Sequence, residues 1–574
     1  MRILLLTHAF NSLTQRLGAA LQGRGHEISI EFDIADSVAE EAVALFRPDL
    51  IVAPYLRRAI PASIWQRHVC LIVHPGIVGD RGPSALDWAL QEGVAEWGVT
   101  VLQAEAEMDA GPVWATTNFP LRAAKKSSVY RNEVTQAAVT AVLQAVERYA
   151  ANELPTPLAD WPDARGRLRP LMKQAERAID WQLDDSATVL RKINAADGFP
   201  GVADSLFGIP CHIFDAWPEA SLAGTEDLTG GAVIARRETA LLRRTCDGAV
   251  WIGHAKREGD FKLPATLAFA EQAADLPEVP LAGWWRVDHA TWQDIAWEEA
   301  DGVGALHFEF YNGAMSTSQC RRLREALAWA KTRPVRVIVL AGGVDFWSNG
   351  IHLNVIEAAS LNDGSPADES WHNINAMNDL ALELIDSGEQ ITIAALAGNA
   401  GAGGCFLARA ADLVWARDGV MLNPHYKNMG NLYGSEYWTY LLPRRVGDEG
   451  ARDIMRNRQP LTARAAVEIG FSDACLAGDG DAFRIDVARR AMELSAAPDL
   501  AERLAAKRER RAADEAEKPL AAYREEELAQ MRRNFYGFDP SYHVARHHFV
   551  RKSLASWTPR HLARHRDLGW TVPQ

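Results

Sequence analysis

The sequence predicts an α/β protein of several domains, and three features of the chain support this prediction. At 574 residues the chain exceeds the size of one ordinary domain. Short apolar runs alternate with helical patterns near the N-terminus and again after residue 300, as is typical of parallel sheets covered by helices. Between these regions, strand patterns punctuated by Gly and Asp predict a small β-rich domain. We therefore expect a doubly wound parallel sheet, a β-rich domain and a second α/β domain with C-terminal helices.

The first domain is expected over residues 1–160. Residues 2–8 form an apolar run suited to a buried parallel strand, and residues 11–22 have helical spacing before Gly23. A polar, Pro-containing stretch at 152–170 predicts a linker to the next domain. Further strands of the parallel sheet are predicted at 28–32, 49–53 and 69–73.

The second domain is expected over residues 171–285 and the third over 295–574. Within the third domain, the charge-rich stretch at 500–530 predicts one helix with a solvated face. Recruitment of a partner protein by that helix is the alternative. The remaining elements are predicted as strands at 231–234, 248–252, 304–310 and 335–341 and a helix at 319–331.

Composition excludes several classes of protein. The formal net charge of −14 argues against nucleic acid as a partner, since phosphate binding relies on an excess of Lys and Arg. The six cysteines are scattered and form no C-x-x-C pair, which fits a reducing cytoplasm and predicts no zinc site. No stretch approaches the roughly 20 apolar residues of a membrane span, and the apolar run at 2–8 is too short for a signal peptide. We expect a soluble, cytoplasmic protein that does not bind membranes.

A candidate acid–base pair lies in the first domain. His74 follows directly after a predicted strand, where sites of doubly wound sheets lie. Asp109 is a candidate carboxylate that would orient the imidazole and stabilise its charged form. Only the fold can bring these two residues together, and structural roles at two turns are the alternative.

The segments around this pair resemble the 10-formyltetrahydrofolate-dependent formyltransferase family. His-Pro-Gly-x-x-Gly-Asp-Arg-Gly-Pro occupies 74–83, and Asp-Ala-Gly-Pro occupies 109–112. The resemblance implies that His74 and Asp109 assist nucleophilic attack on a formyl carbon. It departs at Ile72, where the family has an Asn, so an ordinary amine acceptor is in doubt; such a lost oxyanion donor typically costs on the order of a hundredfold in rate. The residues expected to bind the folate are Arg81, Gly82 and Gly111.

Two glycine-containing segments in the third domain suggest a site for a thioester. Residues 345–353 and 397–405 each follow a predicted strand, and their backbone N–H groups could hold a carbonyl oxygen that gains charge. Close packing of helices is the alternative use of such glycines. The region 295–480 resembles the crotonase (enoyl-CoA hydratase/isomerase) superfamily, which implies oxyanion donors at Ile351 and Gly403 and a coenzyme A thioester as ligand. The residues expected to bind coenzyme A are Ser348, Gly350 and Gly404.

This second site departs from the hydratases of that superfamily. The positions of the two hydration glutamates are Phe406 and Tyr426, so hydration of an enoyl thioester is not expected. Tyr426 and Glu436 form a candidate acid–base pair beside the apolar wall of Phe406. The alternative is that Tyr426 packs in the core while Glu436 lies on the surface. His425 is a weaker candidate.

Two further histidines invite a metal interpretation. His543 and His547 have the i, i+4 spacing that places side chains on one helix face. No H-E-x-x-H motif accompanies them, so we predict a surface helix and no metal site.

The order of the two modules resembles a family of hydrogenase maturation factors. This resemblance implies production of carbon monoxide for the iron centre of [NiFe]-hydrogenase, with hydrogenase maturation proteins as partners. Our hypothesis is an enzyme that acts as a formyl transferase from 10-formyltetrahydrofolate to coenzyme A, coupled to a lyase that decarbonylates formyl-CoA. The alternatives are a formyl hydrolase that releases formate and a non-catalytic scaffold that binds folate and coenzyme A.

Overall fold

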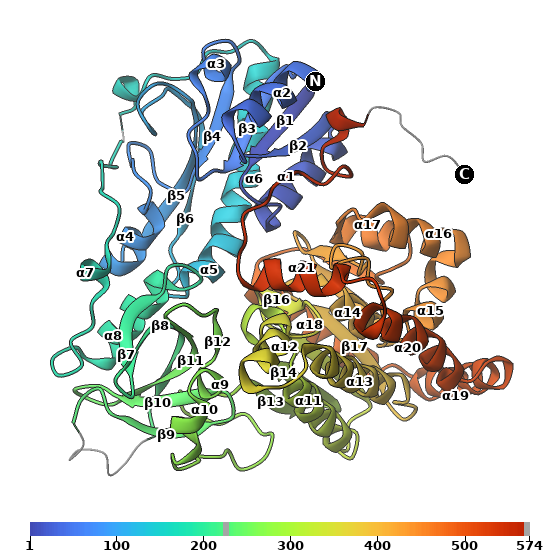
Figure 1. Ribbon diagram of the computed structural model, residues 1–574. Coiled ribbons are helices and arrows are strands. Elements are labelled where there is room, and N and C mark those ends of the chain that lie inside the picture. Colours follow the sequence, from blue (N-terminus) through green and yellow to red (C-terminus); the bar gives the residue numbers. More distant parts are fainter. Residues whose placement is uncertain (163, 222–228, 568–574) are drawn as a thin grey trace.

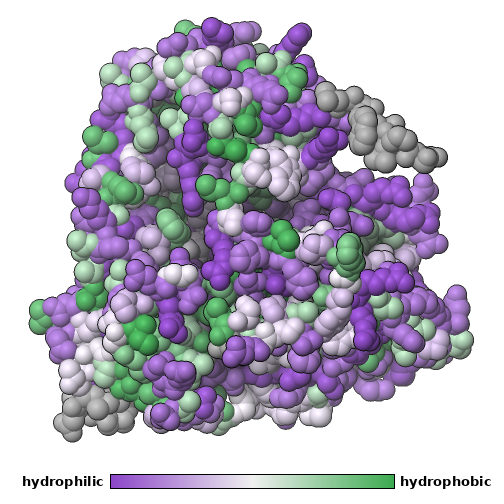
Figure 2. Space-filling view, in the orientation of Figure 1, coloured by the Kyte–Doolittle hydropathy of each residue, from purple (hydrophilic) through white to green (hydrophobic). Residues whose placement is uncertain are grey.

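The computed structural model describes residues 1–162, 164–221 and 229–567, and within them three sheet-containing domains pack together (Figure 1). The first domain lies above the β-rich domain, and the third domain, with its C-terminal helices, lies beside both. Each domain has a hydrophobic core of its own. In the same orientation, polar residues cover much of the visible face (Figure 2). Among the described residues, no helix has both the length and the apolar character needed to cross a membrane.

The first domain contains a six-stranded sheet whose first four strands are parallel. The last two strands, which were not predicted, are antiparallel to their neighbours and extend the predicted parallel sheet. No helix joins these two strands to each other, and a short connection of that kind suits antiparallel neighbours. In sheet order the strands are β2 (Glu27–Phe32), β1 (Arg2–Thr7), β3 (Leu50–Tyr55), β4 (Cys70–His74), β5 (Glu96–Gln103) and β6 (Val113–Pro120).

Helices cover both faces of this sheet (Figure 1). The Asn11 side chain accepts a hydrogen bond from Thr14 N and caps the first helix, which begins where the sequence predicted it. Residues 130–134 form a π-helical turn between two α-helical segments. The helices are α1 (Ser12–Gly23), α2 (Asp36–Phe46), α3 (Ala62–Trp65), α4 (Ala85–Glu92), α5 (Lys126–Val129), η1 (Tyr130–Val134) and α6 (Thr135–Ala150).

The second domain, predicted to be β-rich, is built on an antiparallel sheet. Its apolar side packs against α8 (Ser186–Ala196), which Asp185 caps. In sheet order the strands are β7 (Val202–Leu206), β8 (Ile209–Glu219), β11 (Ala249–Arg257), β10 (Ala240–Arg244) and β9 (Val233–Arg237), with β12 (Leu263–Pro264) paired to β11.

The third domain contains two sheets and a layer of helices. Its larger sheet is parallel except for the first strand pair, and its smaller sheet carries the glycine-containing segments. The larger sheet has the order β13 (Ile295–Ala300), β14 (Val303–Phe308), β15 (Val337–Gly342), β17 (Ile391–Leu396), β19 (Leu413–Arg417), β22 (Ala474–Leu476). The smaller sheet has the order β16 (Phe346–Ser348), β18 (Asn399–Gly401), β20 (Met421–Asn423), β21 (Leu461–Thr462). Its main helices are α11 (Thr317–Ala330), α12 (Leu353–Ala358), α13 (Pro366–Ile385), α14 (Gly403–Arg409), α16 (Pro443–Asn457), α17 (Ala463–Glu468) and α18 (Gly480–Ser495).

The charge-rich stretch is two helices, α19 (Leu500–Glu517) and α20 (Leu520–Tyr536), so the prediction of a single helix is wrong. Pro519 separates them because proline cannot continue a helix. The prediction of a solvated face is incomplete as well. Lys507 and Glu527 are buried, the former against Asp412 and the latter against the turn at Tyr437.

A C-terminal strap, defined here as residues 551–567, follows α21 (Ser541–Val550) and returns to the first domain (Figure 1). There it runs along β2, the edge strand of the first sheet. Ile30 N donates to Leu562 O at 3.1 Å, and Phe32 N donates to Thr558 Oγ1 at 2.9 Å. The strap thus connects the third domain to the first. The fully buried carboxylate of the intervening Glu31 accepts hydrogen bonds from Thr558, His565 and Arg566.

Candidate functional site

The predicted pair of the first domain comes together at the carboxyl end of β4. His74 is the last residue of that strand and is 4% exposed. Its Nδ1 lies 3.5 Å from Asp109 Oδ2, within ion-pair range. Its Nε2 makes a 3.0 Å hydrogen bond with Asp80 Oδ1, a partner that the sequence analysis missed. The signal for Asp80 was its place inside the same motif at 74–83.

The loop that carries Asp109 is held by backbone contacts. Asp109 adopts a left-handed conformation, with φ of 55°, and its Oδ2 accepts a 3.1 Å hydrogen bond from Gly82 N. A Cβ at Gly111 would lie 1.9 Å from Gln103 O, so glycine is required for this close approach. Arg81 forms an ion pair with Glu107. The backbone N–H of Gly82 therefore helps to hold the Asp109 carboxylate in place. Folate contacts by Arg81, Gly82 and Gly111 stay predictions.

Ile72 lies two residues before His74 on β4, so both side chains point to the same face of the sheet. The Ile72 side chain is half-buried and packs against the apolar residues under that face. It offers no hydrogen-bond donor beside the imidazole. Where the formyltransferase family has an Asn, this chain therefore has an apolar side chain beside the imidazole.

The two glycine-containing segments of the third domain lie against each other. A Cβ at Gly350 would be 3.3 Å from Gly403 N, so the backbones of the two segments are adjacent. The amide nitrogens of Ile351 and Gly403 have no hydrogen-bond acceptor among the described residues. Two free, neighbouring N–H groups fit the carbonyl oxygen of a thioester.

Ser348 and Gly404 hold the two glycine-containing segments in position through close contacts. The Ser348 hydroxyl is fully buried and accepts a 3.0 Å hydrogen bond from Gly350 N. A Cβ at Gly404 would lie 2.1 Å from Ser348 O. These contacts fix the shape of residues 348–351, which carry the amide of Ile351. Direct binding of coenzyme A by Ser348, Gly350 and Gly404 stays a prediction.

The candidate acid–base pair lies beside those amides. Tyr426 Oη donates to Glu436 Oε2 at 2.5 Å, and both side chains are buried. A Cβ at Gly403 would be 2.8 Å from the Glu436 carboxyl atoms, so that carboxyl group lies next to the oxyanion donor. The Phe406 ring stacks on Tyr426 with ring centroids 5.4 Å apart. Glu436 is thus an inward-facing group and does not lie on the surface.

Burial controls the ionisation of this pair. Removal from water raises the pKa of Glu436 to about 7, against an ordinary value of 4.5, although hydrogen bonds from Tyr426 and Ser435 oppose the shift. Burial and the neighbouring Glu436 raise the pKa of Tyr426 well above its ordinary value. The tyrosine therefore stays protonated at neutral pH, while the carboxyl group can exchange a proton there.

A second buried carboxyl group supports the turn that presents Glu436. Glu436 and Tyr437 both have left-handed backbones, with φ of 63° and 59°. Asn378 Oδ1 accepts from Glu436 N at 2.7 Å, and Glu527 Oε2 accepts from Tyr437 N at 3.0 Å. Burial raises the pKa of Glu527 to about 8. The sequence analysis missed Glu527 because it lies within a charge-rich helix.

The remaining histidines have separate surroundings. His425 is buried and its ring nitrogens have no hydrogen-bond partner among the described residues; burial lowers its pKa to about 4. His543 Nε2 bonds to Phe535 O, and His547 pairs with Glu357. Within the described ranges, no group of three or more His, Cys, Asp or Glu is arranged to hold a metal ion.

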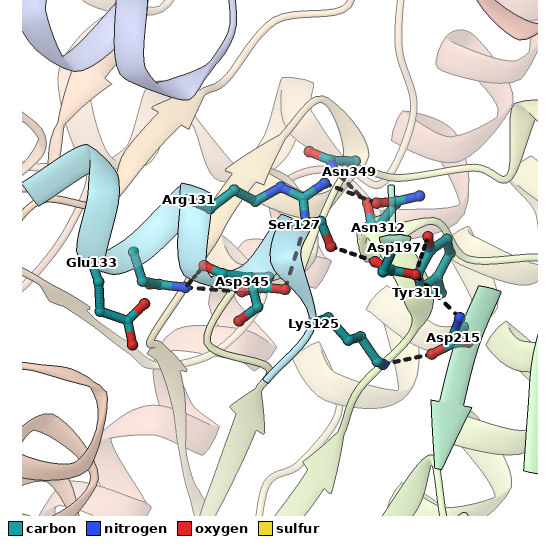
Figure 3. Close-up of polar contacts among 12 residues, drawn as sticks. Lys125, Ser127, Arg131, Glu133, Asp197, Asp215, Tyr311, Asn312, Asp345 and Asn349 are labelled. Carbon is teal, nitrogen blue, oxygen red and sulfur yellow. Dashed lines mark hydrogen bonds and ion pairs between the residues drawn. The ribbon is translucent and has the colours of Figure 1, made fainter. Parts of the chain in front are cut away.

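A polar junction joins the three domains (Figure 3). Lys125 and Ser127 of the first domain reach Asp215 and Asp197 of the second, each at 2.5 Å. Tyr311 of the third domain donates to the same Asp197 at 3.0 Å. On the other side, the π-helical turn of the first domain contacts the third domain at two places. These contacts are Arg131 Nη2 to Asn312 Oδ1 at 3.0 Å and Asn132 Nδ2 to Asp345 Oδ1 at 2.9 Å.

Comparison with known proteins assigns each region to a family. The formyl transferase family matches residues 32–146, and the formyl transferase C-terminal domain matches residues 171–272. The enoyl-CoA hydratase/isomerase family matches residues 302–558. A methionyl-tRNA formyltransferase of Dechloromonas aromatica is 25% identical over 243 residues, which cover 42% of this chain and 76% of the relative.

One relative matches the whole chain. The hydrogenase maturation factor HoxX of Bradyrhizobium diazoefficiens is 54% identical over 568 residues, covering 99% of this chain and 97% of that protein. This chain belongs to the HypX/HoxX family of hydrogenase maturation factors. The crystal structure of HypX from Aquifex aeolicus in complex with tetrahydrofolic acid shares the fold, with a TM-score of 0.95, 46% identity and full coverage of both chains. The predicted α/β multidomain fold class and the resemblance to this HypX/HoxX architecture are confirmed.

Proposed function

We propose that this HypX/HoxX-family chain makes carbon monoxide in two steps. The first domain transfers the formyl group of 10-formyltetrahydrofolate to the thiol of coenzyme A. The third domain then splits formyl-CoA into carbon monoxide and coenzyme A. One observation carries the second step: the buried Tyr426–Glu436 pair adjoins the free amides of Ile351 and Gly403.

The first step requires a base and a means of orienting it. His74 lies at the edge of the sheet where ligands of doubly wound folds bind, and Asp109 is within 3.5 Å of its Nδ1. The imidazole accepts the thiol proton as sulfur attacks the formyl carbon, and the carboxylate stabilises the imidazolium. The crystal structure of the Aquifex HypX contains tetrahydrofolic acid, which supports folate as the donor for this chain as well.

The second step moves one proton from carbon to sulfur. The amides of Ile351 and Gly403 hold the formyl oxygen. The Glu436 carboxylate removes the formyl proton, and the C–S bond breaks to leave carbon monoxide and a thiolate. Tyr426 donates its proton to the sulfur and recovers one from Glu436 across their 2.5 Å hydrogen bond. Phe406 seals one side of the pair from water, which limits hydrolysis of the thioester.

The polar junction explains why the two steps share a chain. It fastens the π-helical turn of the first domain to Asn312 and to Asp345, the first residue of the segment 345–353. A thiol on a long flexible arm that reaches both sites would deliver the intermediate at high effective concentration. We further propose that the carbon monoxide passes to [NiFe]-hydrogenase maturation proteins.

The decisive experiment supplies purified protein with 10-formyltetrahydrofolate and coenzyme A, with carbon monoxide and formate assayed in parallel. We expect carbon monoxide from the wild type and accumulation of formyl-CoA in Tyr426→Phe. Formate without carbon monoxide would show that the protein is a formyl hydrolase. Full maturation activity of both His74→Ala and Tyr426→Phe would instead indicate a non-catalytic scaffold.

A further inference from the structure

We propose that Asp80 is a positioning residue that holds Nε2 of His74, so that Nδ1 is the nitrogen that deprotonates the attacking thiol. This inference rests on the proposed formyl transfer and deepens it. It assigns a role to a carboxylate outside the His74–Asp109 pair. That role matters when the acceptor of the formyl group is a thiol, which must lose its proton.

Asp80 is one of the most enclosed carboxylates of the first domain. Its side chain is fully buried, and Oδ1 lies 3.0 Å from His74 Nε2. A carboxylate only accepts hydrogen bonds, so the proton of this contact belongs to Nε2. A Cβ at Gly76 would lie 2.4 Å from Nε2 and 2.8 Å from Oδ1, so the glycine leaves the space that the contact occupies.

The linker between the first two domains fixes Asp80 from the other side. Arg81 N donates to Arg167 O and Arg169 N donates to Arg81 O, so the linker runs beside the Asp80 loop. Arg169 Nε lies 3.5 Å from Asp80 Oδ2, and its Nη1 bonds to Glu92 at 2.7 Å. The guanidinium offsets the charge of the buried carboxylate, which would otherwise be costly to bury.

This arrangement makes the two ring nitrogens of His74 unequal. Nε2 is occupied by Asp80 at hydrogen-bond distance, whereas Nδ1 is 3.5 Å from Asp109, too far for a good hydrogen bond. In the neutral ring, Nδ1 therefore carries the lone pair and can accept a proton. Protonation of Nδ1 places the new positive charge between the carboxylates of Asp80 and Asp109.

A thiol acceptor needs this base more than an amine acceptor does. A thiol attacks as thiolate and must lose its proton, whereas a neutral amine attacks directly. In the proposed step the S–H proton moves to Nδ1 while the C–S bond forms. The proton then moves to N10 of the folate as the C–N bond breaks, which gives formyl-CoA and tetrahydrofolate with atoms and electrons balanced.

The main test is Asp80→Asn in the full-length protein, with formation of formyl-CoA followed by mass spectrometry. The amide group introduced by this change can also donate a hydrogen bond to Nε2, which permits the tautomer with the proton on Nδ1. The equivalent change in serine proteases lowers kcat by about 10⁴-fold. We expect the turnover number to fall by at least about 10²-fold while the KM for 10-formyltetrahydrofolate stays within about twofold. Asp160→Asn is the matched control, because it makes the same change at an exposed carboxylate of the first domain away from His74, and it should leave the rate unchanged.

Two further readouts keep the inference falsifiable. NMR of protein labelled with ¹⁵N-histidine, assigned with His74→Gln, should show the proton of neutral His74 on Nε2 in the wild type and a mixture of tautomers in Asp80→Asn. Gly76→Ala inserts a methyl group between the two side chains and should reduce the turnover number to a similar degree if Asp80→Asn fails to fold. An Nδ1–H tautomer in the wild type, or an Asp80→Asn rate within threefold of it, would overturn the inference. A wild type that makes no formyl-CoA but shows the Nε2–H tautomer would refute the proposed transfer alone.

Discussion

Replacing Glu436 by glutamine should stabilise the protein at alkaline pH while abolishing its proposed activity. Burial raises the pKa of this carboxyl group from 4.5 to about 7. The folded chain keeps the proton up to about pH 7, whereas the unfolded chain loses it near pH 4.5. The free energy of unfolding therefore falls as the pH rises through this window.

The magnitude follows from the size of the shift. At 1.36 kcal/mol per pKa unit, the wild type is destabilised by about 3 kcal/mol at pH 8 and by less than about 1 kcal/mol at pH 5. Glutamine does not titrate and still offers an oxygen to the Tyr426 hydroxyl. For a domain of this size, each kcal/mol of stability raises Tm by about 2 °C, so the Tm of Glu436→Gln should exceed that of the wild type by about 6 °C at pH 8.

Thermal unfolding of wild type and Glu436→Gln between pH 5 and pH 8 measures this difference. Glu449→Gln, an exposed change on α16, is the control for loss of one negative charge and should leave Tm unaltered. A Tm gain that is the same at both ends of the pH range would refute the argument from burial. The carbon monoxide assay completes the test: wild-type output should rise with pH through about 7, because the base must be ionised, and Glu436→Gln should give none.

Three further predictions concern other parts of the structure. Tyr426→Phe should lower carbon monoxide formation by about 10²-fold or more, with formyl-CoA accumulating; equal output from both proteins would remove the tyrosine from the mechanism. Gly403→Ala places a Cβ 2.8 Å from the Glu436 carboxyl group and should lower output by roughly 10²-fold, whereas Gly388→Ala, which meets only ordinary contacts, should not. Although burial opposes it, hydrogen bonds from the strap lower the pKa of Glu31. Glu31→Gln should therefore cost roughly 1–2 kcal/mol at pH 7, and this cost should shrink as the pH falls below 4.5; a Tm difference that does not change with pH would contradict it.

Local motifs selected the candidate pairs only together with the resemblance to two families. His74 and Asp109 were found from motifs at strand ends, and the structure brings them within ion-pair range. Tyr426 and Glu436 were found because the usual glutamates are missing, and the structure joins their side chains directly. Such motifs are readable since the backbone conformation at these turns restricts the residue types.

Residues whose role depends on distant packing were not predicted. Glu527 lies in a helix with many charges, and only the packing of α20 against the turn at Tyr437 distinguishes it from its exposed neighbours. Asp80 stood within a quoted motif, but its contact with His74 depends on a turn and on the linker that carries Arg169. By contrast, the break between α19 and α20 could have been predicted from sequence, because Pro519 interrupts the helix.

The C-terminal strap has a consequence for biosynthesis. Thr558 lies 526 residues after its partner in β2. At about 5–20 residues per second, the ribosome adds the strap roughly 30–100 s after that edge strand. During this interval β2 exposes unpaired backbone groups, which attract other strands. A chain that ends before the strap would keep this edge unpaired and open to pairing with other chains.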